Sequence, residues 1–266
     1  MHYLIGLLLL CQAAVAFAQP DPFPQVATSY LVEINSTLVW EKQSRRRLPP
    51  ASLTKMMTAL LVSEKDQPQA VVSVSLTAAR ETGTRLHLMP GERFHVHDLL
   101  EAMLIDSAND ACHALADFVA GNEARFVRMM NRRAQQLGMR DTHYANACGH
   151  DEPNHYSSTH DLALLAGALI KRPGITGITA RHEADITTLD GVHSYRFASK
   201  NALIGRYPGA IGLKTGYTPS AGKCLVAYVE RGANKVLLVM LHGNDRWWDA
   251  ADILDLAFDH VREFPS

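Results

Sequence analysis

Three short motifs with reactive side chains stand far apart in this chain, so the fold must bring distant segments together if they act as one site. They are, in chain order, Ser52-Leu53-Thr54-Lys55, Ser107-Ala108-Asn109 and Lys214-Thr215-Gly216. At average residue usage the first two patterns each arise by chance roughly once in a chain of this length, whereas K-T-G arises in about one chain in ten. The order and the wide spacing therefore carry the evidence. Together the motifs predict a serine nucleophile whose base is a lysine.

The spacing within the first motif suits proton transfer from a serine to a lysine. If Ala51 and Ser52 open a helix, Lys55 lies one turn further on, where its amine reaches the Ser52 hydroxyl. A lysine acts as a base only when its pKa is depressed, which burial and a second cation achieve, and we expect Lys214 to be that cation. An isolated S-x-x-K is more often a helix N-cap followed by a solvated lysine, but the other two motifs argue against that interpretation here.

The second motif lies between two helical stretches, where a short connection can direct Ser107 and Asn109 into one cleft. We expect Ser107 to relay a proton to the leaving group. Asn109 has both a donor and an acceptor, so we expect it to hold Lys55 and the amide of a substrate. Asn109 would also suit the N-cap of the following helix, and the two roles are compatible.

The third motif precedes a strand-like run of residues. On an edge strand, the backbone of Lys214, Thr215 and Gly216 can pair with an extended peptide. The missing side chain of Gly216 keeps that approach open. The motif therefore predicts a peptide-binding edge beside the nucleophile.

The periodicity of apolar residues predicts strands at both ends of the chain and helices between them. Alternating residues predict a hairpin over Tyr30–Glu41, and strand-like runs at Leu225–Arg231 and Lys235–His242 on either side of Gly232-Ala233-Asn234 predict a second one. Spacings of three and four predict helices at Thr54–Lys65, His97–Ile105, Asn109–Val119, Glu123–Leu137, Ser158–Lys171 and Trp247–Val261. We expect an α/β (α+β) fold, an antiparallel sheet covered by helices with a helical subdomain, and a site in the cleft between the two.

Residues 1–18 have the pattern of a signal peptide, with an apolar run followed by the small-x-small pattern Ala16-Phe17-Ala18. The run is too short to span a bilayer comfortably, although a short buried helix or a membrane anchor is the alternative. We expect cleavage after Ala18, a periplasmic or secreted protein with no stable membrane anchor, and one catalytic domain over residues 19–266. The formal net charge of −1 gives no attraction for nucleic acid.

Three cysteines remain after such cleavage, namely Cys112, Cys148 and Cys224. An oxidising compartment would allow one disulfide and one free thiol, but no spacing favours a pair, so buried unpaired cysteines are the expectation. Possible metal ligands gather at His150, Asp151, His155 and His160. They lack a compact ligand spacing, so we expect no metal and no other cofactor.

The motif set is that of class A β-lactamases and penicillin-binding proteins. Longer segments resemble the D-alanyl-D-alanine carboxypeptidases, which are low-molecular-mass penicillin-binding proteins with an S-x-x-K serine. These segments are 47–59, 107–111, 137–146, 155–163 and 207–222. The resemblance runs from about Ser29 to Phe264. It has two departures: Ala108 stands where the family often has Gly, and Cys148 stands where it often has Pro, Thr or His.

The resemblance implies a β-lactamase/transpeptidase-like fold and a serine peptidase that cleaves D-Ala-D-Ala in peptidoglycan stem peptides. Ser52 would form the acyl-enzyme, β-lactams would acylate Ser52 as covalent inhibitors, and the N–H groups of Ser52 and Tyr217 would form the oxyanion hole. Arg246 matches an arginine directed at the terminal carboxylate of the substrate, to which Thr215 could add a hydroxyl. Alternatively, Arg246 is a surface residue paired with Asp249.

Three other functions are compatible with parts of the sequence. A peptidoglycan DD-endopeptidase, which cuts cross-links, is favoured by the short remainder of the chain after Lys214. A serine β-lactamase is suggested by Glu152-Pro153-Asn154, which is similar to the deacylating loop of class A enzymes, although residues 155–158 fit the carboxypeptidases better. A non-catalytic penicillin-binding module would not need the complete reactive set Ser52, Lys55, Ser107, Asn109 and Lys214.

Overall fold

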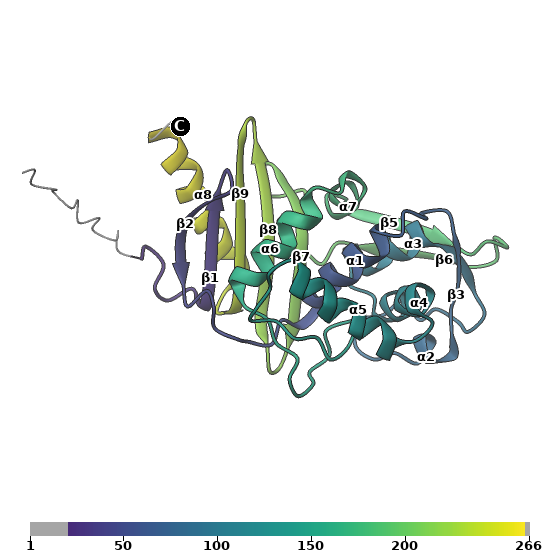
Figure 1. The fold of residues 1–266 in the computed structure, drawn as a ribbon. Coiled ribbons are helices and arrows are strands. Elements are labelled where there is room, and N and C mark those ends of the chain that lie inside the picture. The colour runs from purple at the N-terminus through teal and green to yellow at the C-terminus, as the bar shows by residue number, and fades with distance from the viewer. Residues whose placement is uncertain (1–20, 264–266) are drawn as a thin grey trace, which may run out of the picture.

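The computed structural model describes residues 21–263, so the predicted signal peptide and its cleavage site lie outside the described residues. The main sheet has five antiparallel strands in the order β2-β1-β9-β8-β7. Their bounds are β1 Ala27–Ile34, β2 Thr37–Lys42, β7 Ala210–Thr218, β8 Gly222–Arg231 and β9 Asn234–Gly243. Strands from the two ends of the chain therefore lie side by side, and the segments between them form a second, mainly helical region (Figure 1). The predicted arrangement is confirmed.

Helices and two small hairpins make up the rest of the described chain. The helices are α1 Lys55–Ser63, α2 Leu76–Ala79, α3 Val96–Glu101, α4 Asn109–Ala120, α5 Glu123–Gln136, α6 Thr159–Ile170, α7 Pro173–Thr179 and α8 Arg246–Glu263. The hairpins pair β3 Val71–Ser73 with β4 Arg93–His95, and β5 Glu183–Thr187 with β6 Ser194–Ala198. These hairpins, α2 and α7 were not predicted from the sequence, because each element is only three to seven residues long and too short to show a clear period.

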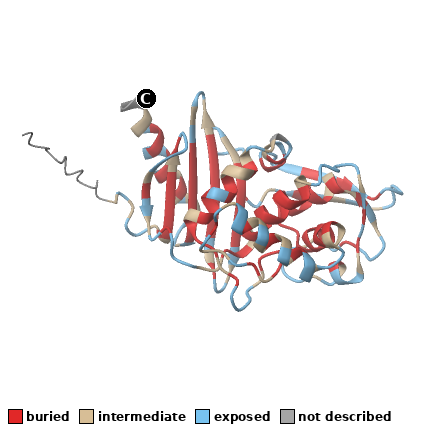
Figure 2. Ribbon diagram, in the orientation of Figure 1, coloured by how far each residue is buried: buried red, intermediate tan, exposed pale blue. Residues whose placement is uncertain are grey.

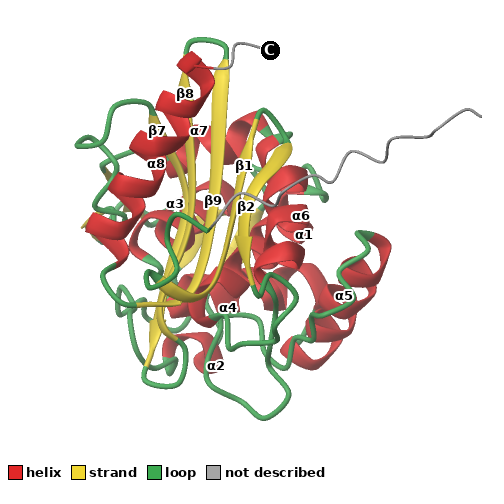
Figure 3. Ribbon diagram, turned by 90° about the vertical axis from the view of Figure 1, so that its left-hand side faces the viewer, coloured by secondary structure: helices red, strands yellow, loops and turns green. Residues whose placement is uncertain are grey.

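The sheet is buried on both faces (Figure 2). Because successive side chains of a strand point to opposite faces, Leu31 joins the core shared with α1 and α6, while Tyr30 and Val32 join the core beneath α8. Figure 3 shows α8 on one side of the sheet and α1 and α6 on the other. The sequences of the central strands are therefore nearly continuous apolar runs. The core shared with α1 and α6 holds the N-terminus of α1 against the sheet.

Three local predictions need correction near the motifs. Residues Ala51–Thr54 form a 3₁₀ turn, η1, and α1 begins only at Lys55, so Ser52 does not open an α-helix. The predicted helix 97–105 changes after Glu101 into a π-helical turn, η2, over Ala102–Asp106. Asn109 is the first residue of α4 and its side chain points to Lys55, so it is not the N-cap, which is Ala108.

The expectation of unpaired cysteines is wrong for two of the three. Cys112 in α4 and Cys148 in the loop 145–150 form a disulfide, with Cα atoms 6.0 Å apart and a sequence separation of 36 residues. Cys224 in β8 is buried and free. No local spacing predicts this pair, because the loop reaches α4 only through the packing of α4, α5 and α1.

Candidate active site

The first motif brings a lysine amine to a serine hydroxyl. Lys55 Nζ lies 3.0 Å from Ser52 Oγ, although the two residues belong to different helical elements. In a 3₁₀ turn, residues three apart lie above one another. The turn therefore brings the amine of Lys55 to the hydroxyl of Ser52, as an α-helix was expected to do. Ala51 just before the serine has a φ of 49°, in the left-handed region, and directs the chain from Pro50 into the turn.

Lys55 is enclosed by oxygen atoms from three segments and is fully buried. Besides Ser52, its amine contacts Asn109 Oδ1 at 2.7 Å and the backbone oxygen of Cys148 at 2.6 Å. Burial, followed by the positive charge of Lys214, holds the pKa of Lys55 well below its usual range. Glu81 and Asp110 oppose this shift. A buried amine with a depressed pKa beside a hydroxyl is suited to act as a general base.

Ser107 and Asn109 flank a sharp reversal of the chain between η2 and α4. Ser107 is buried and has a φ of 70°, a conformation that costs a non-glycine residue roughly 1–3 kcal/mol and persists only where the surroundings impose it. Asn109 is fixed at both ends of its amide, because Nδ2 donates to the backbone oxygen of Thr82 at 2.5 Å. The reversal therefore keeps the acceptor of Asn109 on Lys55.

Lys214 supplies the second buried cation, from the sheet side of the site. It lies in β7, is 2% exposed, and donates to the backbone oxygen of Thr215 at 3.0 Å. Burial, followed by repulsion from Arg246, lowers the pKa of Lys214 to about 7, while Asp106 acts in the opposite direction. Lys214 can therefore carry a positive charge near neutral pH and lose it within the physiological range.

Two glycines allow the backbone around Ser52 to be closely packed. A Cβ at Gly216 would lie 3.1 Å from Ser52 N and from the Pro50 oxygen, so glycine lets β7 approach the 3₁₀ turn without a tight contact. A Cβ at Gly149, which has a φ of 92°, would lie 2.0 Å from the Ala51 oxygen. β7 is an edge strand, and Tyr217 beside Gly216 has a 63% exposed side chain. An extended ligand can thus reach both the strand edge and Ser52.

Arg246, at the start of α8, points into the sheet and not along the helix surface. Its Nη1 donates to the backbone oxygens of Gly216 at 2.8 Å and of Cys224 at 3.1 Å. Its guanidinium stacks on Trp247, with 4.4 Å between Cζ and the ring centroid. Within residues 21–263, Arg246 Nε is buried without a hydrogen-bond partner. Asp249 instead accepts from the backbone of Asp245, so the alternative of an Arg246–Asp249 pair is not what the structure contains.

The site also contains groups that no sequence motif indicated. Glu81 accepts from His113 at 2.7 Å and from His150 at 2.8 Å, and these hydrogen bonds and charges outweigh burial and lower its pKa to about 2. The backbone oxygen of Cys148 was missed because a carbonyl has no sequence signature. In the described part of the chain, no three His, Cys, Asp or Glu side chains gather where they would hold a metal ion.

Two hollows are lined by residues that neighbour the motifs in the chain. A groove of about 630 Å³ lies between the loop 83–86 and β6, with Asp106 and Lys200 in its lining. A second hollow of about 260 Å³ is lined by Pro50, Ala51 and the loop 150–153, which contains the exposed Glu152. Ala51 and Asp106, which line these hollows, directly precede Ser52 and Ser107 in the chain, so both hollows adjoin the motifs.

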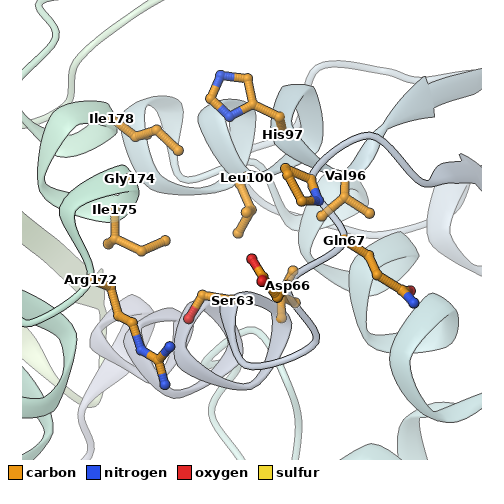
Figure 4. A pocket seen from close by; sticks show the side chains of 12 residues that line it. Ser63, Asp66, Gln67, Val96, His97, Leu100, Arg172, Gly174, Ile175 and Ile178 are labelled. Atoms are coloured by element: carbon orange, nitrogen blue, oxygen red, sulfur yellow. The ribbon is translucent and has the colours of Figure 1, made fainter.

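A further cavity lies at the other end of α1 (Figure 4). Its volume is about 290 Å³, and α1, α3 and α7 contribute Ser63, Leu100 and Ile175 to the lining. Ser63 is eight residues after Lys55, which is about 12 Å along a helix. None of the three motifs contributes a residue to this lining. The candidate active site is therefore the region around Ser52 and Lys55, where the linings of the other two hollows include the neighbours of Ser52 and Ser107.

No helix within residues 21–263 combines the length and the apolar character that crossing a bilayer requires.

Comparisons with known proteins agree with this geometry. Residues 16–245 match the model of the family described as D-alanyl-D-alanine carboxypeptidase. The chain is 35% identical over 277 residues to the D-alanyl-D-alanine carboxypeptidase DacF of Bacillus subtilis, covering 98% of this chain and 71% of that protein. Against other curated relatives it spans as little as 51% of their length.

Solved structures give the same result for the fold. A D-alanyl-D-alanine carboxypeptidase from Mycobacterium tuberculosis has a TM-score of 0.84 at 29% identity, covering 92% of this chain and 95% of that one. A variant of a Streptomyces DD-transpeptidase has a TM-score of 0.82 at 27% identity, covering 88% and 98%. The predicted transpeptidase-like fold is confirmed, and the chain belongs to the D-alanyl-D-alanine carboxypeptidase family.

Proposed function

We propose that this protein is a serine-type D-Ala-D-Ala carboxypeptidase that removes the terminal D-alanine from peptidoglycan stem peptides. The observation that carries the proposal is the buried amine of Lys55, 3.0 Å from Ser52 Oγ and with a depressed pKa. Family membership supports the choice of substrate. No cofactor takes part in this reaction.

Acylation begins when neutral Lys55 takes the proton of Ser52. Ser52 Oγ attacks the carbonyl carbon of the D-Ala-D-Ala bond, and the N–H groups of Ser52 and Tyr217 stabilise the oxyanion. The C–N bond then breaks, and the proton passes from Lys55 through Ser107 to the amine of the departing D-alanine. The approach of Gly216 to Ser52 N supports this oxyanion site, because it brings both N–H groups to adjacent segments.

Substrate recognition uses the edge of β7 and the positive charges beside it. The stem peptide adds to the outer edge of this strand, as extended peptides do on exposed sheet edges. Its terminal carboxylate faces Arg246 and the Thr215 hydroxyl. The partial burial of Arg246 next to Lys214 supports this role, because adjacent cations in a desolvated cleft favour an anion.

Water then attacks the acyl-enzyme, with Lys55 taking its proton, and releases the shortened peptide. A β-lactam carbonyl presents the same reactive carbon to Ser52, so β-lactams act as covalent inhibitors. We further propose that residues 1–18 are a signal peptide cleaved after Ala18 and that residues 19–266 act in the periplasm or are secreted. The Cys112–Cys148 disulfide supports an oxidising compartment.

The test is to incubate the protein with a purified disaccharide pentapeptide and with a cross-linked dimer, and to identify the products by mass. Loss of a single D-alanine from the pentapeptide is the expected result. Ser52→Ala should abolish both this turnover and labelling by a fluorescent penicillin, since one oxygen attacks both carbonyls. Labelling that persists in Ser52→Ala contradicts the nucleophile, and cleavage of the dimer alone identifies an endopeptidase.

A further inference from the structure

The Cys112–Cys148 disulfide joins two segments that both hold Lys55. Cys112 lies one turn after Asn109 in α4, and Cys148 lies in the loop 145–150. Asn109 Oδ1 and the Cys148 backbone oxygen are two of the three oxygens around the amine, at 2.7 and 2.6 Å. The covalent bond therefore fixes the separation between the two carbonyl groups that contact the amine of Lys55.

These two carbonyl groups decide where a neutral Lys55 directs its lone pair. A carbonyl oxygen accepts hydrogen bonds but cannot donate, so each one takes an N–H of the amine. A neutral amine has two N–H groups, and both are then used. Its lone pair is left for the third neighbour, Ser52 Oγ, whose hydroxyl can donate. The pair of carbonyls thus directs the amine to receive the proton of Ser52.

The loop 145–150 is held from its other sides by weaker contacts. Asn146 Oδ1 accepts from the backbone of Gly149 at 2.7 Å and of His150 at 3.1 Å. Thr58 donates to the backbone oxygen of Ala147 at 2.7 Å. These hydrogen bonds shape the loop and tie it to α1, while the disulfide ties it covalently to α4. Both sulfurs belong to residues that are at most 1% exposed, so the bond is shielded from solvent.

We propose that the Cys112–Cys148 disulfide is a positioning element for the general base, which holds the Asn109 and Cys148 carbonyls so that the lone pair of Lys55 points at Ser52. The inference rests on the proposed function, in which Ser52 is the nucleophile and Lys55 its base. Without the bond, α4 and the loop separate and water reaches Lys55. Because burial is the main cause of its depressed pKa, that pKa then rises and less of the amine is neutral.

The experiment compares the wild-type chain with Cys112→Ala/Cys148→Ala. Peptide mapping of the denatured, unreduced wild type first checks that Cys112 and Cys148 are linked. Penicillin acylation and pentapeptide turnover are then measured across the acidic to alkaline range. We expect kcat of the double variant to fall by about 10- to 100-fold near neutral pH, because small misplacements of catalytic groups have effects of this size. KM should stay within about twofold of the wild-type value. The rising limb of the pH profile should move to higher pH, because the pKa of Lys55 rises when its burial is lost.

Two controls separate positioning from stability. Wild-type chain produced in reduced form keeps every side chain and should show the same displaced pH profile. Leu254→Ala, in the core beneath α8, should lower the melting temperature without displacing the profile. The reduced chain also provides the test if the double variant does not fold.

Acylation rates and pH profiles that match the wild type in a disulfide-free protein overturn the proposal. A loss of activity that is proportional to the unfolded fraction, as expected for Leu254→Ala, also overturns the proposal. A bond that only stabilises the fold would lower the activity in this way. Unlinked Cys112 and Cys148 in the mapped wild type overturn the proposal as well. If the wild type forms no acyl-enzyme, the proposed function itself is contradicted. The same labelling assay shows this before the variants are compared.

Discussion

The helical side and the sheet side of the cleft each bury one lysine, and they treat it differently. Lys55, at the start of α1, is surrounded by three oxygens of neutral groups. Lys214, in β7, has one backbone oxygen at 3.0 Å and lies among the charges of Arg246, Asp106 and Lys200. Burial lowers both pKa values, and each cation disfavours charge on its neighbours. In the proposed mechanism, the helical side therefore supplies the base and the sheet side supplies a positive charge.

The largest effect is expected from removing the base. Lys55→Arg keeps a positive charge but cannot give up its proton near neutral pH, so acylation by penicillin should fall by about 10²–10⁴-fold. Stopped-flow acylation measures this rate, and circular dichroism checks the fold. Near-normal acylation would place the base elsewhere and remove the distinction between the two lysines.

A substitution at Lys214 tests the role of the sheet side of the cleft. Lys214→Met should lower acylation by roughly 100-fold, since a preorganised charge in the cleft is lost. Removal of this cation raises the pKa of Lys55, so the rising limb of the pH profile should move to higher pH. Movement to lower pH, or no movement, would show that the two lysines are not coupled.

The pH profile of the wild type follows from the same two groups. In the proposed mechanism, activity requires neutral Lys55 and charged Lys214, so the rate should rise as Lys55 loses its proton and fall as Lys214 loses its own at a pH of about 7. Lys214→Arg keeps its charge at all these pH values, and the falling limb should disappear. A falling limb that survives in this variant belongs to another group.

In the proposed mechanism, Arg246 adds its positive charge to the part of the site that binds the substrate carboxylate. Losing a hydrogen bond to a charged group costs roughly 1.5–3 kcal/mol, so Arg246→Ala should lower kcat/KM for a pentapeptide by about 10- to 150-fold. A carboxyl-amidated pentapeptide should lose much less. Equal losses on both substrates would show that Arg246 does not read the carboxylate and would favour cleavage of internal cross-links.

The smallest effect on the reaction is expected at Glu152, which lies on an exposed loop. The sequence of this loop is similar to the deacylating loop of class A β-lactamases. Glu152→Ala should leave the deacylation rate within about twofold of the wild type, as most exposed substitutions do. Release of bound fluorescent penicillin over time measures this rate. An acyl-enzyme trapped in the variant would support a β-lactamase.

The success of the sequence predictions depended on how local each feature is. The strands around Val32 and Leu238 were predictable because short apolar runs bounded by turn residues are local signals. Helices α4 and α5 were predictable because their apolar residues recur at helical spacing. The 3₁₀ turn at Ala51–Thr54 was not predictable, because Gly216 and Gly149, which are remote in the chain, pack closely against this turn. The pairing of Cys112 with Cys148 likewise depends on packing between segments 36 residues apart.

The sequence by itself determined the reactive groups and their order, since a hydroxyl, an amine and a carboxamide are properties of residue types. It also determined the family, through segments that surround those groups. Only the tertiary structure decided which oxygens surround Lys55, where Arg246 points and how far each pKa moves. The physical reason is that desolvation and Coulomb interactions depend on distances through space, and here they join residues such as Lys55 and Lys214 that are remote in the chain.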